Sequence, residues 1–513
     1  MIVRDIMKRA VDRFGDHVAL TQHGKSLTFG EAWERGCRMA NLLSASGVRP
    51  GDRVASLEDN TIPAADLLLA CTIGNFVRVP LYVRNATASH IHMVGHTGAT
   101  AYIVDADHAA DRDEIVAACP DLKFVMTRGD DYEDVLAGSD PTDPQPKVSE
   151  SDYHIIRHTA GTTGLSKGVA FTNRRWMSVA RDWLYGWPPI EPGDTFLHQS
   201  PISHGSGYFF TPTWMAGGRN YLVRKLVPDE VLALVERERI THMLGIPTIL
   251  GILLKHPDAG ERDLSSLKAI TVSGAPIADD TIRLAYQTFG DALYTSFGQT
   301  EINPITFMHV KEWLSEVPGS NPLRSCGRAQ HFGQMKIIDP ATHEELPIGQ
   351  EGEIAAKADG QMEAFWGDPE ATEERIVDGW VFTGDVGKID ANGYLYIMDR
   401  KNDMIVSGGF NIYPAELENV ILSHPDVSEV AVFSIPHERW GEAPAAVCVV
   451  DEDSTLTGDE IVELVKDRLG SYKKPAEVIV RTEPLPKSAA GKLLKRQLRE
   501  PYWAGHDRRV AGS

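Results

Sequence analysis

The sequence predicts an α/β fold with a large N-terminal domain of layered α/β sheets and a small α+β C-terminal domain. The chain has 513 residues, more than one hydrophobic core usually supports. Short β-branched runs alternate with helical patterns as far as about residue 390, which is typical of α/β layers with a mainly parallel sheet. Beyond Asp399 a second alternation of strands and helices occupies about 110 residues, enough for a separate small domain. We therefore predict domains at 1–398 and 399–505, with a tail at 506–513.

The first predicted element is an amphipathic helix. Apolar side chains recur at helical spacing from Val3 to Phe14, and charges interrupt them, so this segment is not a signal peptide. The most apolar window, 63–83, contains Asp66 and Arg78 and is too polar to cross a membrane. The five cysteines include no CxxC pair, which favours reduced thiols over disulfides or a zinc site. We expect a cytoplasmic protein without a membrane span.

Three predicted strands end in polar loops. "HIIRHTAG" runs into a glycine-rich loop, "LKAITVSGAP" ends at Gly274 and Pro276 before a helix, and "DALYTSFGQTE" ends in a polar segment. Ligands of parallel α/β sheets bind at the carboxyl ends of strands. We therefore expect these loops to contribute to one shared site.

The C-terminal domain begins with a strand, a charged segment and a glycine pair. A helix is predicted at 414–422, with Pro414 at its start, where proline is favoured. Two strands, a helix and a further strand follow, in the stretches "VSEVAVFSI", "PAAVCVVDE", "GDEIVELVKDRLG" and "AEVIVRT". This pattern predicts a compact α+β unit.

The stretch "RHTAGTTGLSKGVAF" gathers glycines and threonines around Lys167. Glycines let backbone N–H groups converge on an anion, hydroxyls add donors, and a lysine supplies a mobile positive charge. The spacing does not fit GxxxxGK[ST], which disfavours a P-loop kinase or GTPase. The stretch predicts a mobile loop that closes over a pyrophosphate, and a surface turn is the alternative.

The stretch "SFGQTE" places Glu301 at the end of a strand. A single carboxylate there suits Mg²⁺ beside a polyphosphate, and Phe297 offers a flat face for a base. The alternative is an aromatic core residue and a solvated glutamate.

Two further motifs contain charged residues that are candidates for ligand binding. In "DGWVFTGDVG" we predict a tight loop after a strand, in which Asp385 accepts from ribose hydroxyls; a simple Asp–Gly turn is the alternative. Arg400 suits phosphate, ribose or a surface salt bridge. In "LPKSAAGKLLKRQLR", Lys492 stands at the head of a basic helix, which is alternatively a solvated surface.

The order of these motifs resembles the adenylate-forming superfamily, which includes acyl-CoA synthetases, aryl-CoA ligases, peptide-synthetase adenylation domains and firefly-type luciferases. The resemblance covers nearly the whole chain, in "HTAGTTGLSKGV", "VSGAPI", "YTSFGQTE", "GWVFTGDVG", "DRKNDMIVSGGFNIYPAELE" and "LPKSAAGK". It implies an acid–thiol ligase that uses ATP, Mg²⁺ and coenzyme A to make an acyl-adenylate and then a thioester. It also implies that the C-terminal domain is mobile.

The resemblance implies how the polyphosphate is bound. The glycine-rich loop with Lys167 binds the β- and γ-phosphates, Thr300 touches the α-phosphate, and Glu301 holds Mg²⁺. The other loop residues implied are Thr159, Gly161, Thr162, Thr163 and Gly164.

The same resemblance implies the nucleoside contacts. Phe297 stacks on the adenine, and Asp385 binds the ribose hydroxyls with help from Arg400. The residues implied to line the adenine are Gly274, Ala275 and Pro276.

Lys492 is implied to bridge the attacking carboxylate and the α-phosphate. Rotation about a hinge near Asn402 then withdraws Lys492 and brings Gly408 and Gly409 to the pantetheine channel. His204 matches a gate at the acyl pocket. The catalytic residues implied in this way are Lys167, Thr300, Lys492 and His204.

The sequence departs from the family pattern at several positions. Ala160 removes a hydroxyl donor, Ser166 replaces the usual proline, and Asn402 stands where aspartate or lysine is common. These changes affect the loop and the hinge and leave the residues that activate the carboxylate in place. The aromatic residues after His204 hint at an aromatic or medium-length acyl group, although such residues more often belong to the core.

The charge of the chain and its expected partners bear on which other functions remain open. A net charge of −21 disfavours nucleic-acid binding, because the chain lacks the basic surface that a phosphate backbone needs. The expected partners are a small carboxylate and coenzyme A. A separate carrier protein, with its phosphopantetheine, or another nucleophile is the alternative acceptor. A non-catalytic nucleotide sensor is the alternative outside enzymes.

Overall fold

The computed structural model describes residues 2–159, 166–274, 277–400, 403–407, 410–437, 439–487 and 493–504. It divides into two compact units. Unit 1 comprises Met1–Met335, Ala356–Phe382 and Asn392–Leu395, and unit 2 comprises Lys336–Ala355, Thr383–Ala391 and Tyr396–Ser513. The predicted α/β fold with a separate, smaller C-terminal unit is confirmed. The predicted boundary between residues 398 and 399 stays a prediction.

Unit 1 contains a seven-stranded sheet in which β3, β4, β5, β6 and β7 pair in parallel. Its strand order is β18-β8-β7-β4-β3-β5-β6. The strands are β3 (Arg53–Leu57), β4 (Val77–Leu81), β5 (Ala101–Asp105), β6 (Phe124–Arg128), β7 (Tyr153–His158), β8 (Gly168–Thr172) and β18 (Ala364–Phe365). Helix α2 (Phe29–Ala45) precedes β3, and the helices between successive strands from β3 to β7 are α3 (Ile62–Gly74), α4 (Thr87–Thr97), α5 (Arg112–Ala118) and α6 (Tyr132–Ala137).

A nine-stranded sheet also belongs to unit 1. Its order is β15-β14-β13-β12-β11-β9-β10-β1-β2, and the strands from β13 to β1 pair in parallel. The strands are β1 (Val18–Gln22), β2 (Lys25–Thr28), β9 (Thr195–His198), β10 (Arg219–Leu222), β11 (His242–Leu244), β12 (Ala269–Val272), β13 (Leu293–Thr295), β14 (Thr306–His309) and β15 (Arg328–Ala329). Its helices are α9 (Pro228–Arg237), α10 (Pro247–Lys255), α11 (Asp279–Phe289) and α12 (Val310–Trp313).

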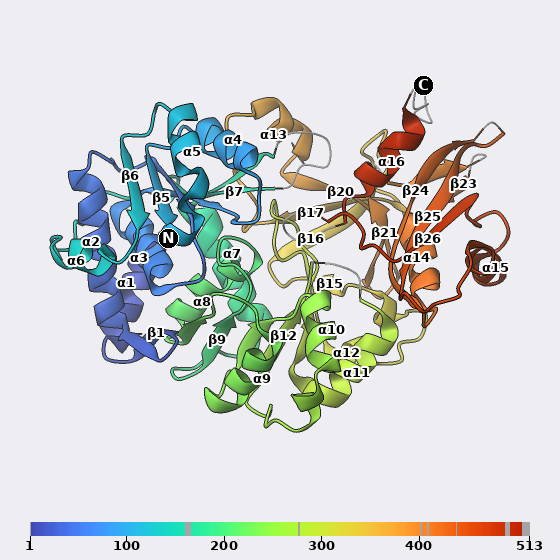
Figure 1. The fold of residues 1–513 in the computed structure, drawn as a ribbon, viewed down its shortest axis with the longest axis horizontal. Coiled ribbons are helices and arrows are strands. Elements are labelled where there is room, and N and C mark those ends of the chain that lie inside the picture. The colour runs from blue at the N-terminus through green and yellow to red at the C-terminus, as the bar shows by residue number, and fades with distance from the viewer. Residues whose placement is uncertain are drawn as a thin grey trace. The chain divides into compact units, whose positions relative to one another are not determined.

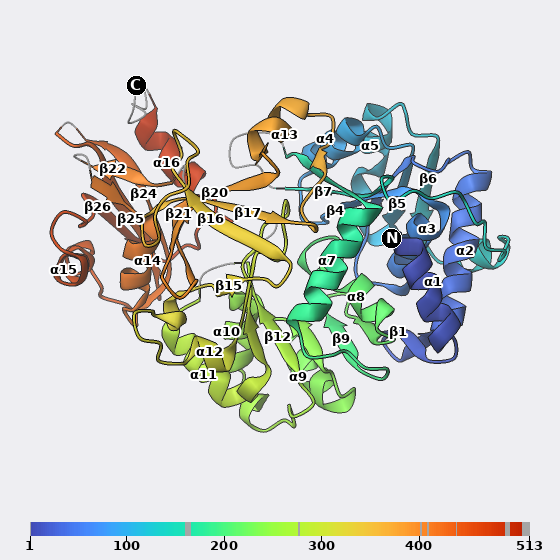
Figure 2. The ribbon, with the colours of Figure 1, turned by 180° about the vertical axis from the view of Figure 1, so that it is seen from behind.

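Helices α7 (Asn173–Gly186) and α8 (Phe210–Met215) lie between these two sheets in both views of the ribbon (Figures 1 and 2). The predicted N-terminal helix is confirmed as α1 (Val3–Phe14), which buries its apolar face. Trp214 on α8 donates from Nε1 to the carbonyl of Met7, 3.1 Å away. The main apolar core is therefore sandwiched between the sheets, and the carboxyl ends of their strands border it.

A further sheet has the order β16-β17-β20-β19, with β21 paired to β20. The division between the units runs through its strands β16, β17, β20 and β21. The elements are β16 (Gly333–Ile338), β17 (Gly352–Ala358), β19 (Ile376–Val377), β20 (Trp380–Ile389), β21 (Leu395–Arg400) and, before β19, helix α13 (Pro369–Arg375).

Unit 2 contains the predicted α+β pattern. Its sheet has the order β23-β22-β25-β24, and β26 pairs in parallel with β25. The predicted helix at 414–422 is confirmed, with Pro414 in its first turn. The elements are β22 (Ile405–Ser407), β23 (Phe410–Ile412), α14 (Pro414–Leu422), β24 (Val427–His437), β25 (Gly441–Val450), α15 (Gly458–Leu469), β26 (Glu477–Arg481) and α16 (Lys495–Trp503).

Two negative predictions concern the described part of the chain. All five cysteines are free thiols, and four of them are buried. None of the helices in the described ranges is long and apolar enough to cross a membrane.

Candidate functional site

The three loops of the predicted shared site belong to two sheets. β7 lies in the seven-stranded sheet, whereas β12 and β13 lie in the nine-stranded sheet. Side chains nevertheless join the ends of these strands. Arg157, the penultimate residue of β7, donates from Nη2 to the carbonyl of His204 in the segment after β9. Tyr208, from the same segment, donates its hydroxyl to the carbonyl of Thr300 after β13, 3.4 Å away.

Lys167 forms an ion pair with Asp368, with its Nζ 3.1 Å from the carboxylate. Asp368 also caps helix α13 by accepting from the amide of Ala371. The hydrogen bond from the amide of Ala371, and to a smaller extent the contact with Lys167, hold the pKa of Asp368 below its usual value. Because both partners of the ion pair are well exposed, the pair contributes little to stability, and Lys167 can leave it at little cost. Asp368 belongs to none of the predicted motifs, because it lies 201 positions from Lys167.

The glycine-rich loop is anchored at both ends. The amide of Thr159 donates to the carbonyl of Lys167 at 3.1 Å, and the carbonyl of Ser166 lies 2.9 Å from Nε2 of His92 on α4. The contact uses the backbone carbonyl of Ser166, which the usual proline would also supply, so this contact does not explain the departure at this position. Gly161, Thr162, Thr163 and Gly164, with the departure at Ala160, lie outside the described residues.

His158 ends β7 on the side of α4, with its ring centroid 6.0 Å from that of His96. Burial, with smaller contributions from His96 and His92, lowers the pKa of His158 to about 3, so its ring is neutral at physiological pH. Neither ring nitrogen has a hydrogen-bond partner within the described chain.

Glu301 is buried, so the alternative of a solvated glutamate is wrong. Its Oε1 lies 3.4 Å from Nη2 of Arg375 on α13, and its carbonyl accepts from the amide of Met362 at 2.7 Å. No group of three or more metal-binding side chains occurs among the residues that the structure describes. Mg²⁺ beside a polyphosphate takes one or two carboxylates and completes its shell with phosphate oxygens. The single carboxylate of Glu301 fits an ion held in that way.

The residues predicted to line the adenine are described only in part. Gly274 follows β12 with φ +92°, a conformation that favours glycine, whereas Ala275 and Pro276 lie outside the described residues. Phe297 is half-buried and packs against the apolar cluster that contains Ile302 and Ile305. This packing agrees with the alternative of a core aromatic residue and leaves adenine stacking a prediction.

The segment after β9 is tightly held. Asn60 donates to the carbonyls of His198 and Ser200 at 2.8 Å each, and its own oxygen accepts from the amide of Ile202 at 2.8 Å. The ring of His204 lies 5.0 Å from that of Tyr82. The aromatic residues that follow are buried: Phe209 packs on Trp183, and Tyr208, Phe210 and Trp214 are at most 5% exposed. The aromatic run thus belongs to the core and carries little information about the substrate.

In unit 2, the predicted tight loop at 383–385 is wrong, because these residues lie within the continuous strand β20. Gly384 takes φ +69°, which glycine adopts without strain, so the strand continues through this position. The amide of Gly384 donates to Oε1 of Glu353 at 3.0 Å, and the hydroxyl of Thr383 donates to the carbonyl of Ile354 at 2.8 Å. Asp385 is buried, at 5% exposed.

Several predicted site residues lie outside the described residues of unit 2. They are Lys492, Gly408, Gly409 and the hinge residue Asn402, and for Arg400 the backbone alone is described. Helix α16 begins at Lys495, after Lys492.

Two family models match the chain. One, described as AMP-binding enzyme, covers residues 7–366, and the other, described as AMP-binding enzyme C-terminal domain, covers residues 416–492. The chain belongs to the AMP-binding enzyme family. The predicted membership of the adenylate-forming superfamily is thereby confirmed.

Named relatives are similar over almost their whole length. A feruloyl-CoA synthase from Amycolatopsis sp. is 34% identical over 96% of this chain and 97% of its own. A fatty acid–[acyl-carrier-protein] ligase, ScoC from Streptomyces coeruleorubidus, is 29% identical over 96% of this chain and 95% of its own. The solved structure of o-succinylbenzoate CoA synthetase (MenE) from Bacillus subtilis, in complex with its acyl-adenylate intermediate, is 26% identical. It matches with a TM-score of 0.87 over 96% of this chain and 97% of that one.

Proposed function

We propose that this protein is an AMP-forming acyl-CoA synthetase. A carboxylate attacks the α-phosphorus of ATP and the bond to the β-phosphate breaks. Pyrophosphate departs, and the product is an acyl-adenylate. The thiolate of coenzyme A then attacks the acyl carbon and AMP leaves. The observation that carries this conclusion is the match to the AMP-binding enzyme family over 7–366 and 416–492. Relatives and solved neighbours named as CoA synthetases and ligases support the choice of reaction.

We propose that unit 1 supplies the residues that hold the polyphosphate. Lys167 leaves Asp368 and binds the β- and γ-phosphates together with the glycine-rich loop. Glu301 holds Mg²⁺, which when bound neutralises phosphate charge, and Thr300 faces the α-phosphate. The support is the weak, exposed pair of Lys167 and the buried position of Glu301.

The proposed roles of unit 2 rest on the resemblance. Asp385 binds the ribose, and Lys492 neutralises the repulsion between the attacking carboxylate and the α-phosphate. Removal of one such preorganised charge typically costs ~3–4 kcal/mol in the transition state, or roughly two to three decades in rate. Withdrawal of Lys492 about a hinge near Asn402, with Gly408 and Gly409 taking its place, serves the second step.

The activity is tested with purified protein, ATP, Mg²⁺, coenzyme A and a panel of carboxylic acids. We expect pyrophosphate release and a new CoA thioester in the mass spectrum. No pyrophosphate with any acid contradicts the proposal and favours a nucleotide sensor. We further expect Lys492→Ala to suppress pyrophosphate exchange far more than thioester formation from a supplied acyl-adenylate. Equal losses in both assays would refute that division of labour.

A carrier protein is the second candidate acceptor, because the relative ScoC is named as an acyl-carrier-protein ligase. Adenylation without thioester formation from coenzyme A, together with acylation of a phosphopantetheinylated carrier protein, favours this acceptor. We place the reaction in the cytoplasm, and the five free thiols support that location.

A further inference from the structure

Arg157 is a buried arginine whose charge is not matched by any acidic side chain in the described part of the chain. It is 5% exposed. Its guanidinium donates from Nη2 to the carbonyl of His204 and lies 4.0 Å from the ring centroid of Tyr208 and 5.8 Å from that of Trp176. The titratable groups that act on it are Tyr208, which is neutral near pH 7, and Arg78, which repels it.

A buried, permanently charged guanidinium without a counter-charge is costly, and it persists where something else compensates it. The aromatic face of Tyr208 and one carbonyl supply part of that compensation. Nε and Nη1 of Arg157 have no hydrogen bond within the described residues. These donors therefore remain for a ligand.

The segment that Arg157 bonds through the carbonyl of His204 contains further polar atoms without a partner among the described residues. Residues 199–203 immediately precede His204, and three of their buried polar atoms have no hydrogen-bond partner in the described ranges. These atoms are Gln199 Oε1, Ser200 Oγ and Ser203 Oγ. Buried polar atoms are nearly always paired, so this group points to a polar ligand or ordered water.

The polyphosphate is not the ligand that this geometry favours. Successive side chains of a strand point to opposite faces. His158 lies on the face of β7 toward α4, where Ser166 is anchored, whereas Arg157 contacts Trp176 on α7 and the residues after β9. Arg157 therefore faces the layer between the two sheets, on the side of His204, which we assign to the acyl pocket.

We propose that Arg157 recognises an oxygen atom on the acyl group itself, so that the enzyme prefers carboxylic acids with a second oxygen acceptor to their all-hydrocarbon counterparts. This inference rests on the proposed function, because it names the substrate class of the same site. The acceptor is a carboxylate, keto or phenolic oxygen held by the remaining N–H groups of Arg157. The polar atoms of residues 199–203 that no described residue pairs lie in the segment that leads to His204, whose carbonyl Arg157 bonds.

The experiment compares matched acids as substrates for adenylate formation. The pairs are hexanoate against 5-oxohexanoate and adipate, and 3-phenylpropanoate against 3-(4-hydroxyphenyl)propanoate. We expect the wild type to show at least a tenfold higher kcat/KM for an oxygenated acid than for its hydrocarbon partner. Adipate against 5-oxohexanoate separates an anionic from a neutral acceptor.

The variant Arg157→Met tests the residue. We expect it to lower kcat/KM for the preferred oxygenated acid at least tenfold. The kcat/KM for the hydrocarbon partner and the KM for ATP should each change less than threefold. Arg157→Lys, which keeps the charge, should restore part of the preference. Arg262→Met is the control, because Arg262 is half-buried and paired with both Asp258 and Glu236, and its loss should change kcat/KM for neither acid.

The outcomes are distinct. A wild type that adenylates acids without preference, or an Arg157→Met variant that slows both members of a pair equally, overturns the inference and leaves the proposed function standing. A wild type that adenylates no acid overturns the proposed function instead. Thermal unfolding checks that each variant folds, and if Arg157→Met does not, Arg157→Gln replaces it in the same comparison.

Discussion

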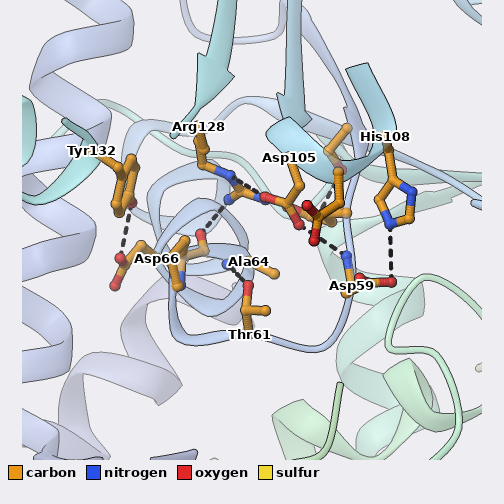
Figure 3. A network of polar contacts seen from close by, with 12 residues as sticks. Asp59, Thr61, Ala64, Asp66, Asp105, His108, Arg128 and Tyr132 are labelled. Carbon is orange, nitrogen blue, oxygen red and sulfur yellow. Dashed lines mark hydrogen bonds and ion pairs between the residues drawn. The ribbon is translucent and has the colours of Figure 1, made fainter. Parts of the chain in front are cut away.

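Two sets of buried charges lie in the seven-stranded sheet of unit 1, and they differ in how they are compensated. The first, which we call the Glu58 network, is fully paired. Glu58 lies 3.1 Å from Nη2 of Arg78 and 2.7 Å from Nη2 of Arg128, and Arg128 also bonds Asp105. Figure 3 shows Arg128 against Asp105, with Tyr132 on Asp66 and His108 on Asp59 nearby. The second is Arg157 alone, on β7.

The difference separates a structural use of buried charge from a functional one. In the Glu58 network each charge has an opposite partner, so the fold itself satisfies it and a ligand is not required. Arg157 has an aromatic face and a carbonyl, and no acidic side chain of the described ranges pairs with it. Both sets are equally buried, so burial by itself does not identify the residue with a function.

The largest expected effect concerns a third kind of buried titratable group, the neutral histidines, and it is the response to acid. Four buried histidines, His154, His158, His198 and His242, have pKa values lowered by burial to about 3, 3, 4 and 4. They are neutral when folded but take up protons below about pH 6.5 when unfolded, so stability falls as the pH drops from 6.5 toward 4. At pH 5 each should cost about 2 kcal/mol. Urea midpoints between pH 7.5 and 5 measure this, and a flat profile contradicts it.

Next in size is the substitution Glu58→Gln. Among the described residues, it leaves Arg78 with no carboxylate partner and Arg128 with Asp105 alone. Breaking a buried ion pair in this way costs about 3–5 kcal/mol. The shift of the urea midpoint measures this cost. The preference among acids should not change in the molecules that remain folded. The control is Glu34→Gln, which removes an exposed pair with Arg38 and should change stability by at most about 0.5 kcal/mol.

Arg157→Met should have a much smaller effect on stability than Glu58→Gln. Replacing an uncompensated buried charge by an apolar side chain of similar length is often neutral or stabilising, so we expect a change within about 1 kcal/mol. Urea unfolding of the variant gives the value. A loss as large as that of Glu58→Gln would show that Arg157 is structural and would remove the contrast.

The smallest expected effect belongs to Asp368→Asn. It removes the charge that holds Lys167 in the described structure but retains an oxygen that can cap α13. Lys167 is then released for the phosphates, and the KM for ATP should fall by a factor of about two to three. Steady-state kinetics with varied ATP measure this change. A raised KM would mean that Asp368 helps to position Lys167 instead of sequestering it.

Local patterns predicted much of the fold. The helical spacing of apolar residues predicted α1, and the proline before "AELENV" predicted the start of α14. The strands that end at His158, Val272 and Thr295 were predicted from β-branched runs followed by polar loops. The error at Thr383–Asp385 has a local cause, because an Asp–Gly pair predicts a turn but a glycine with positive φ also fits within a strand.

The site was predictable only as a set of motifs. The pairing of Lys167 with Asp368, and of Glu301 with Arg375, joins residues 201 and 74 positions apart. No residue pattern shows which charge will meet which across such distances. Arg157 was likewise visible in the strand before the glycine-rich loop, but whether a carboxylate of the described residues meets it depends on every side chain packed around it.

The sequence by itself determined the family, the order of the motifs and the local elements, because periodicity and turn chemistry act between residues that are neighbours in the chain. The tertiary structure decided that the site loops of unit 1 come from two sheets, and which buried charges are paired. The physical reason is that compensation of a charge depends on the groups within a few ångströms in space, which the fold brings together from remote positions.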